Sequence, residues 1–344
     1  LLVSSAASDV YKRQEKKELF PMQNDIHKLK NKHILVTGGA GFIGSNLCHY
    51  LVTNKIKVTC LDNLITGKLD NIKDLIDQDG FTFVEGDITN IEDCNKACEK
   101  IDIILHQAAL GSVPRSIENP INTNNVNING FVNMLWAAKA NNIKRVIYAA
   151  SSSTYGDSKA LPKVEENIGS PLSPYAVTKY VNELYADVFA SLYGLELIGL
   201  RYFNVFGRKQ DPNGAYAAAI PKFIKAFLNH ESPIIHGDGS QSRDFTYIDN
   251  VLQANILAAT TTDRDAINQV YNVACGEQSI LIDLVKHIRK LLANFDPEIE
   301  NIPIQFGPER IGDIKHSLAS VHKIERLLNY KASHTVHTLS LIHI

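Results

Sequence analysis

The stretch from Ser173 to Lys179, which reads SPYAVTK, contains residue types that could transfer a proton. Ser173 suits the N-cap and Pro174 the first turn of a helix, so the sequence predicts that a helix begins here. Tyr175 and Lys179 are four residues apart and would rise from one helix face. An ammonium beside a phenol favours the phenolate, so the pair could act as a general base, although this spacing also occurs by chance.

A serine run and a glycine-rich turn support a catalytic interpretation. Residues 151–153 are all serine and follow the apolar run 145–150, so a hydroxyl there could donate to a substrate and relay a proton to the tyrosine. Gly38, Gly41 and Gly44 lie between the apolar run 32–37 and a helical pattern from Ser45 to Thr53. Strand, glycine turn and helix together are the context of a dinucleotide-binding fingerprint, although the spacing GxxGxxG is one residue longer than the common form.

Polar and small residues follow the next strands at the same sheet edge. Asp62 ends the apolar run 57–61, where a carboxylate can accept both ribose hydroxyls and would repel a 2′-phosphate, which favours NAD over NADP. Asp87 follows the run 81–85 and could contact adenine, and small residues after Leu105 would leave room for a cofactor. An ordinary turn aspartate is the alternative for Asp62.

The elements that must position these residues alternate between apolar runs and helical patterns. Strands are predicted at 32–37, 57–61, 81–85, 101–105, 145–150 and 195–200, and helices at 45–53, 119–140 and 175–193. This rhythm predicts an α/β fold, a doubly wound parallel Rossmann sheet spanning residues 31–207. The rhythm breaks after Gly207, so residues 208–330 are predicted to form mainly a smaller α/β substrate lobe, with parts of 233–275 returning to the sheet.

The lobe contains predicted helices at 220–229, 250–260 and 280–293. Arg243 and Arg310 are far apart in sequence, yet two guanidinium groups facing one cleft would suit a substrate diphosphate. Surface ion pairs are the alternative for both arginines, and spacing alone does not decide between the two interpretations.

Composition limits the compartment and the partners. A formal charge of -2 gives no reason to expect a nucleic-acid partner, and the absence of an apolar run of about 18 residues predicts no membrane span. Five scattered cysteines suit a reducing compartment and form no zinc site, so we expect a cytoplasmic protein without a metal. Residues 1–21 are expected to be a scar or disordered segment before Met22, and residues 331–344 a truncated or artefactual tail.

Seven motifs occur in one order: TGGAGFIGSN, LDNL, HQAALGSVPRS, SSSTYG, SPYAVTK, RYFNVFG and GDGSQSRDFTYIDNV. Together they resemble the extended short-chain dehydrogenase/reductase family over about residues 31–330, and within it the nucleotide-sugar 4-epimerases. The resemblance implies an enzyme that uses NAD to interconvert UDP-GlcNAc and UDP-GalNAc for surface polysaccharides. It also implies a homodimer that pairs through the helices at 119–140 and 175–193.

The resemblance assigns site residues by motif match. The implied cofactor site comprises Gly38, Gly41, Phe42, Ile43, Gly44, Asp62, Asn63, Asp87, Ile88, Gln107, Ala108, Asn127, Tyr175 and Lys179. The implied nucleotide-sugar site comprises Ser112, Arg115, Ser151, Ser152, Tyr175, Asn204, Ala218, Arg243, Arg310, Asp313 and Ser317. Asn127 could alternatively be a helix-cap or solvated residue.

The implied mechanism gives Ser151, Tyr175 and Lys179 the catalytic roles. Tyr175, its pKa lowered by Lys179 and the nicotinamide charge, takes the proton of the 4-hydroxyl, and hydride passes from carbon 4 to NAD. The resulting 4-keto sugar turns in the pocket and receives the hydride on its other face. Ser317 occupies the position where a tyrosine would crowd an N-acetyl group, so a serine is expected to leave room for it.

The same motifs also indicate which other activities of this fold are possible. Sugar dehydratases of this fold carry an Asp-Glu pair where Ser152 and Ser153 stand, so dehydration is disfavoured. An epimerase for UDP-glucose or UDP-glucuronate remains an alternative, as does a non-catalytic NAD-binding protein. The sequence departs from the family pattern at His236, at Ile311 and after Tyr330, where no closing helix follows, so a truncated, unstable enzyme is a further alternative.

Overall fold

Seven parallel strands form the central sheet, in the spatial order β11-β6-β5-β4-β1-β2-β3. The computed structural model describes residues 23–213, 218–309 and 315–336. The strands are β1 (His33–Thr37), β2 (Lys57–Asp62), β3 (Phe81–Glu85), β4 (Ile103–His106), β5 (Arg145–Ser151), β6 (Glu196–Tyr202) and β11 (Gln269–Val273). The expected doubly wound Rossmann fold is therefore confirmed, and its switch point lies between β1 and β4, where parallel sheets bind ligands.

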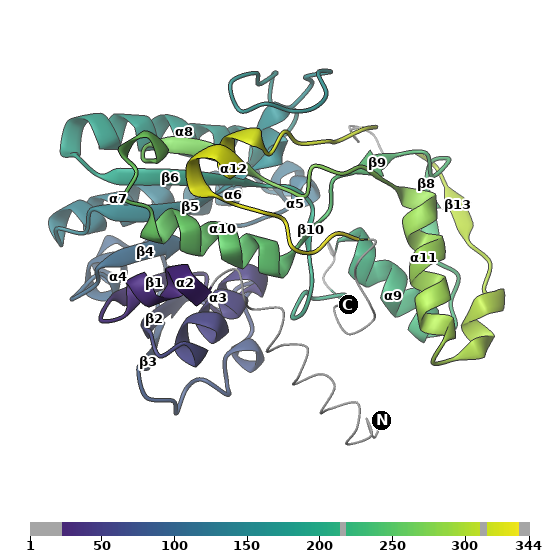
Figure 1. Cartoon of the computed structure of the whole chain (residues 1–344), viewed down its shortest axis with the longest axis horizontal. Coiled ribbons are helices and arrows are strands. Elements are labelled where there is room, and N and C mark those ends of the chain that lie inside the picture. The colour runs from purple at the N-terminus through teal and green to yellow at the C-terminus, as the bar shows by residue number, and fades with distance from the viewer. Residues whose placement is uncertain (1–22, 214–217, 310–314, 337–344) are drawn as a thin grey trace.

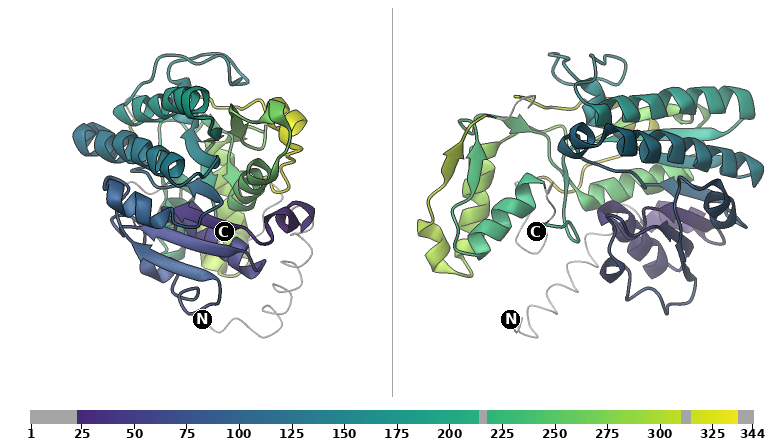
Figure 2. Two further views of the ribbon diagram at one scale, coloured as in Figure 1. Left: turned by 90° about the vertical axis from the view of Figure 1, so that its left-hand side faces the viewer. Right: turned by 180° about the vertical axis from the view of Figure 1, so that it is seen from behind.

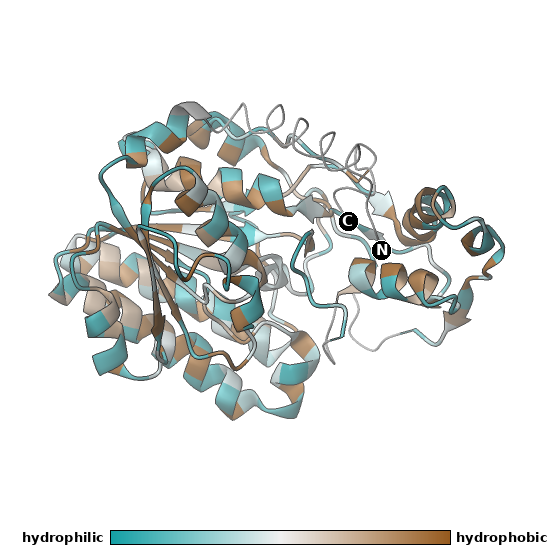
Figure 3. Ribbon diagram, turned by 90° about the horizontal axis from the view of Figure 1, so that it is seen from below, coloured by the Kyte–Doolittle hydropathy of each residue, from teal (hydrophilic) through white to brown (hydrophobic). Residues whose placement is uncertain are grey.

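Helices cover both faces of this sheet (Figures 1 and 2). One layer contains α4 (Ile91–Ala97), α7 (Gly130–Ala140) and α8 (Pro174–Tyr193), and the other contains α2 (Gln23–Ile26), α3 (Phe42–Thr53) and α10 (Ile248–Thr260). Each layer encloses its own apolar core against the strands, and Figure 3 shows the hydrophobic colouring concentrated between the layers. Strands buried on both faces explain why they read as continuous apolar runs rather than as alternating patterns.

The helix predicted at 119–140 is made of three consecutive pieces. They are α6 (Pro120–Asn124), a π-helical turn at Asn125–Asn129 and α7, and the short α5 (Val113–Glu118) precedes them. A π-turn widens the helix locally and turns Asn127 into the protein interior, where it is buried.

The smaller lobe lies at the carboxyl end of the sheet (right-hand side of Figure 1). It contains α9 (Ala219–Leu228), α11 (Leu281–Ala293), and two small strand pairs: β8 (Ile234–His236) with β13 (Gln305–Gly307), and β9 (Ser242–Arg243) with β12 (Ser279–Ile280). The pair β7 (Val205–Phe206) and β10 (Thr246–Tyr247) connects the lobe to the sheet.

The chain returns to the large domain after the lobe. β11 is an edge strand that the sequence pattern did not identify individually, and α12 (His322–Leu328) packs on it rather than on the lobe. Residues 331–336, expected to be part of a tail outside the fold, contact α10: the Asn250 side chain bonds the backbone of Ser333 and His334. None of the described helices is long and apolar enough to cross a membrane.

Candidate active site

The glycine turn between β1 and α3 brings the backbone close to the β4 segment. Gly38 has a φ of +66°, and a Cβ there would lie 2.8 Å from backbone atoms of Ala108. A Cβ on Gly44 would lie 2.1 Å from the carbonyl oxygen of Gly38, so helix and turn can approach this closely only without side chains. The first N–H groups of α3 thus face a cradle suited to a pyrophosphate.

A pocket of about 320 Å³ lies beside this turn. Ten of the predicted cofactor residues line it: Gly38, Gly41, Phe42, Ile43, Gly44, Asp62, Asn63, Ile88, Gln107 and Ala108. They come from the ends of β1, β2 and β4, the β3–α4 connection and the start of α3, so segments far apart in sequence meet at one sheet edge. Their backbone amides, carboxylate and small side chains fit the parts of a dinucleotide.

Asp62 is buried at the end of β2 and is fixed by the backbone. Its carboxylate accepts hydrogen bonds from the N–H groups of Ala40 and Leu64 at 2.9 and 2.8 Å. Burial raises the pKa of Asp62, and these N–H groups act against the rise. Asn63 donates to the carboxylate of Asp87 at 2.8 Å, so these two predicted cofactor residues are bonded to each other.

Gln107 and Asn127 have different surroundings. Gln107 lines the pocket and is held by Tyr202, whose hydroxyl donates to it at 3.0 Å, and by Asn255. Asn127 lies outside the residues that line the pocket: its side chain bonds the backbone of Leu110 on both its oxygen and its nitrogen. Asn127 therefore holds the loop after β4 in place, and its predicted cofactor contact stays a prediction.

The catalytic candidates meet where β5 ends and α8 begins. Ser173 caps α8 by accepting from the N–H of Ala176 at 3.2 Å, as its position before Pro174 predicted. Ser151 is the last residue of β5, and its hydroxyl is close enough to the Tyr175 phenol to lower the pKa of that phenol. The Ser153 hydroxyl donates to Ser151 at 2.9 Å, so the two serines are linked beside the tyrosine.

Lys179 is buried one helical turn after Tyr175 and donates to the carbonyl oxygen of Ala149 at 2.8 Å. Burial lowers the pKa of Lys179 to about 8, and the carboxylate of Glu183 acts in the opposite direction. Burial raises the pKa of Tyr175, whereas its hydrogen bond with Ser151 lowers it. Without bound ligand, the pKa of Tyr175 is therefore raised, whereas the implied mechanism expects it to be lowered. The reason is that burial disfavours the phenolate more than Ser151 stabilises it.

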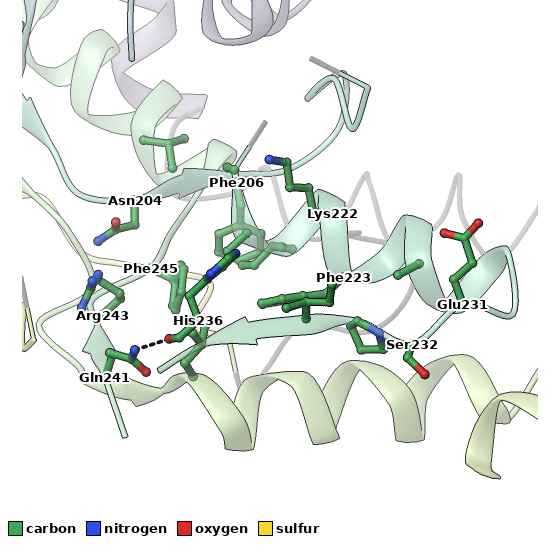
Figure 4. A pocket seen from close by; sticks show the side chains of 18 residues that line it. Asn204, Phe206, Lys222, Phe223, Glu231, Ser232, His236, Gln241, Arg243 and Phe245 are labelled. Atoms are coloured by element: carbon green, nitrogen blue, oxygen red, sulfur yellow. Dashed lines mark hydrogen bonds between the residues drawn. The ribbon is translucent and has the colours of Figure 1, made fainter. Parts of the chain in front are cut away.

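A second pocket, of about 550 Å³, lies between the lobe and the strand ends (Figure 4). It brings together the predicted residues Asn204, Ala218 and Arg243. Lys222 and His236 add nitrogen-bearing side chains, while Phe206, Phe223 and Phe245 supply apolar walls. A cavity that combines cations with aromatic rings suits a molecule with an anionic part and a flat ring.

The other predicted substrate residues lie outside both lining sets. Ser112 caps α5 by accepting from the N–H of Arg115 at 3.2 Å, and Ser152 begins the short 3-10 turn after β5. Ser317 lies beside β9, where its N–H donates to the carbonyl oxygen of Ser242 at 3.0 Å. Arg310 and Asp313 lie outside the described residues.

Several residues near the site were missed in the sequence. Phe223 belongs to the apolar stripe of α9, which the sequence presents as an ordinary packing face, and Lys222 precedes it. Arg201 and Glu183 form a buried two-bond ion pair, at 2.9 and 2.7 Å, one turn beyond Lys179. The sequence shows that Lys179 and Glu183 have helical spacing on α8. It does not show that Arg201 on β6 is the partner of Glu183.

A Rossmann sheet with a glycine cradle and a Ser/Tyr/Lys set at the same edge defines a class of NAD-dependent enzymes that transfer hydride and protons at a hydroxyl-bearing carbon. The model of the NAD dependent epimerase/dehydratase family matches residues 34–274. The chain belongs to this family, and it is an NAD-dependent nucleotide-sugar 4-epimerase.

Characterised relatives cover most of the chain. A UDP-N-acetylglucosamine 4-epimerase from Methanobrevibacter ruminantium M1, solved with UDP-N-acetylmuramic acid, is 40% identical with a TM-score of 0.82, covering 89% of this chain and 96% of that one. The UDP-glucuronic acid 4-epimerase of Bacillus cereus, solved with UDP-glucuronic acid and NAD, is 32% identical with a TM-score of 0.80, covering 88% and 95%. The UDP-glucose 4-epimerase of Mycolicibacterium smegmatis is 33% identical over 86% of this chain and 92% of its own.

Proposed function

We propose that this epimerase interconverts UDP-GlcNAc and UDP-GalNAc through a 4-keto sugar, supplying precursors for surface polysaccharides. The observation that carries the sugar assignment is Ser317, whose backbone is tied to β9 next to the pocket residue Arg243. A serine side chain lacks the ring of a tyrosine, so this position would not crowd the acetamido group of an N-acetylated sugar. The similarity to a UDP-N-acetylglucosamine 4-epimerase supports the same assignment.

The residues at the sheet edge have distinct tasks in this reaction. NAD, when bound, supplies the hydride acceptor and donor for carbon 4 of the sugar. Tyr175 takes the proton of the 4-hydroxyl and later returns it, while Ser151 bonds the phenol and orders its oxygen. The buried ammonium of Lys179 supplies positive charge that favours the phenolate once a ligand excludes water. Arg243, with Lys222 in the same pocket, binds the diphosphate.

Proton NMR of the purified protein tests the assignment directly. Separate incubations with UDP-GlcNAc, UDP-glucose and UDP-glucuronate, without added NAD, are followed by the anomeric signals of the 4-epimers. Inversion of UDP-GlcNAc at the highest kcat/KM is expected. A clear preference for UDP-glucose or UDP-glucuronate would replace the N-acetyl assignment with that sugar, and no inversion even with added NAD would favour a non-catalytic NAD-binding protein.

The outer faces of α7 and α8 support a homodimer. Exposed apolar side chains gather there: Trp136, Leu184, Tyr185, Val188, Leu192 and Tyr193. The rings of Trp136 and Tyr193 meet edge to face at 5.9 Å, so the two helices present one continuous apolar surface. Such a surface marks an interface with another molecule, and pairing with a second copy gives a four-helix bundle.

Sedimentation velocity tests this dimer. Leu192→Glu places a charge on the surface of α8 and is expected to give a monomer, whereas Phe295→Glu, at an exposed apolar position in the lobe, should leave the dimer intact. A dimer that survives the first substitution would exclude this face.

We assign the protein to the cytoplasm, because all five of its cysteines are free thiols, as expected in a reducing compartment.

A further inference from the structure

Residues 315–320 form an extended strap that lies between the lobe and the loop after β5. On one side, the backbone of Ser242 in β9 makes two hydrogen bonds with the strap, each of 3.0 Å. On the other side, the backbone of Lys163 makes two more, at 2.7 and 2.8 Å. The strap therefore joins a wall of the substrate pocket to the large domain.

A buried carboxylate holds this strap in place. Asp244, which follows β9, is 0% exposed. One of its oxygens accepts from the N–H of Cys275 at 2.9 Å, and the other accepts from Gly276 at 3.0 Å and from Ala319 in the strap at 3.2 Å. A single side chain thus connects three segments: β9, the turn after β11, and the strap.

Three of the proposed substrate residues are attached to this connection. The Asn204 side chain donates to the backbone oxygen of Asp244 at 2.9 Å. Arg243 precedes Asp244 in the chain and donates to the carbonyl oxygens of Ser242 and Lys315 at 2.9 and 3.2 Å. The strap residue Lys315 therefore helps to orient the Arg243 guanidinium. Ser317 lies within the strap itself. Figure 4 shows Asn204 and Arg243 side by side at one end of the pocket.

We propose that Asp244 is a positioning residue for substrate affinity: its carboxylate clamps the strap against β9 and thereby sets the places of Arg243 and Ser317. The inference rests on the proposed binding of a nucleotide sugar in this pocket. Asp244 itself touches no reacting atom, so its loss should weaken nucleotide binding more than it slows the chemical step.

The clamp is expected to depend on pH. A proton on either carboxylate oxygen takes up a lone pair and removes the negative charge, so the protonated form holds the three N–H donors more weakly than the carboxylate does. Burial raises the pKa of Asp244 to about 6, with the backbone N–H groups opposing the rise. Affinity should therefore fall as the pH drops through about 6. The ionisable side chains that interact with the carboxylate are Cys275, Glu277 and Tyr330.

The experiment compares wild type, Asp244→Asn and the control Asp238→Asn, whose carboxylate lies in the exposed turn before β9. The Kd of UDP-GlcNAc is measured by calorimetry from pH 5 to 8, alongside its KM and kcat, because its diphosphate is a diester and lacks the terminal phosphate that titrates near pH 6 in UDP. Wild type should bind UDP-GlcNAc about fivefold more weakly below pH 6, which corresponds to the loss of one hydrogen bond. Asp244→Asn should show this weaker binding at pH 7.5 and no step near pH 6, with bound NAD retained and kcat within about twofold of wild type.

Two outcomes would overturn the inference. One is a wild-type Kd for UDP-GlcNAc that is constant or tightens as the pH falls. The other is an Asp244→Asn variant that keeps the wild-type KM, or that loses kcat and NAD instead. The wild-type series decides the matter even if the variant does not fold, because no group of UDP-GlcNAc titrates near pH 6. Binding of UDP-GlcNAc needs no turnover, so failure of the epimerase assignment would be seen separately, as binding without inversion.

Discussion

Replacing Glu183 with glutamine should reduce both the stability and the alkaline tolerance of the enzyme. Glu183 lies on α8, where its carboxylate binds the Arg201 guanidinium of β6 through two hydrogen bonds at 2.9 and 2.7 Å. Both side chains are nearly inaccessible, with 6% of Glu183 and 4% of Arg201 exposed. Arg201 also donates to the carbonyl oxygen of Glu165 at 2.9 Å and lies over the ring of Tyr155.

The substitution leaves a buried guanidinium without its counter-charge. Breaking a buried ion pair by removing one partner costs about 3–5 kcal/mol. A glutamine oxygen can still accept one of the two bonds, and the Glu165 carbonyl remains, so we expect the lower end, about 3 kcal/mol. This loss is a large part of the roughly 5–15 kcal/mol that stabilises a typical native protein.

The same carboxylate also affects the active site, because it supports the charge of Lys179 one turn away. The pKa of Lys179 is already lowered to about 8 by burial, and removing the opposing effect of Glu183 lowers it further. Lys179 is charged only below its pKa. The falling alkaline limb of the kcat/KM profile should therefore move to lower pH in Glu183→Gln.

Urea unfolding and a pH–rate profile from pH 6 to 10 test the two effects. The matched control is Glu196→Gln, whose carboxylate pairs with Arg145 at 2.6 Å but is 37% exposed, so its loss should cost at most about 1 kcal/mol and leave the profile unchanged. Equal destabilisation by the two variants, or an unshifted alkaline limb in Glu183→Gln, would refute the reasoning.

Three further substitutions test the site. Tyr175→Phe should abolish turnover while NAD remains bound, as judged by the cofactor released on denaturation; turnover near wild type would remove its role as the base. Ser317→Tyr should lower kcat/KM for UDP-GlcNAc at least about tenfold relative to UDP-glucose, because an added ring competes with the acetamido group for space; an unchanged ratio would contradict the steric argument. Gly44→Ala should lose bound NAD and unfold at lower temperature, because its Cβ would meet the Gly38 carbonyl oxygen at 2.1 Å, whereas Gly111→Ala, with nothing within 4 Å, should keep the wild-type unfolding temperature.

The sequence determined the features that depend on neighbouring residues. Apolar runs flanked by turns are sufficient to predict six of the seven sheet strands, because a strand buried on both faces must be apolar throughout. The cap at Ser173 and the glycine turn at Gly38 are likewise local, since each follows from backbone geometry over a few residues. The shared sheet edge of the Ser/Tyr/Lys set also follows, because parallel strands place their carboxyl ends together.

Tertiary structure alone decided which buried polar groups meet. The Asp244 carboxylate accepts from the N–H groups of Cys275, Gly276 and Ala319, which follow it by 31, 32 and 75 positions in the chain. No local sequence pattern indicates that a carboxylate there will bind three backbone N–H groups. Likewise, the sequence does not show that Asn127 bonds the backbone of the loop after β4, or that burial raises the pKa of Tyr175. Burial and hydrogen-bond partners set these roles, and both depend on which distant segments the folded chain brings into contact.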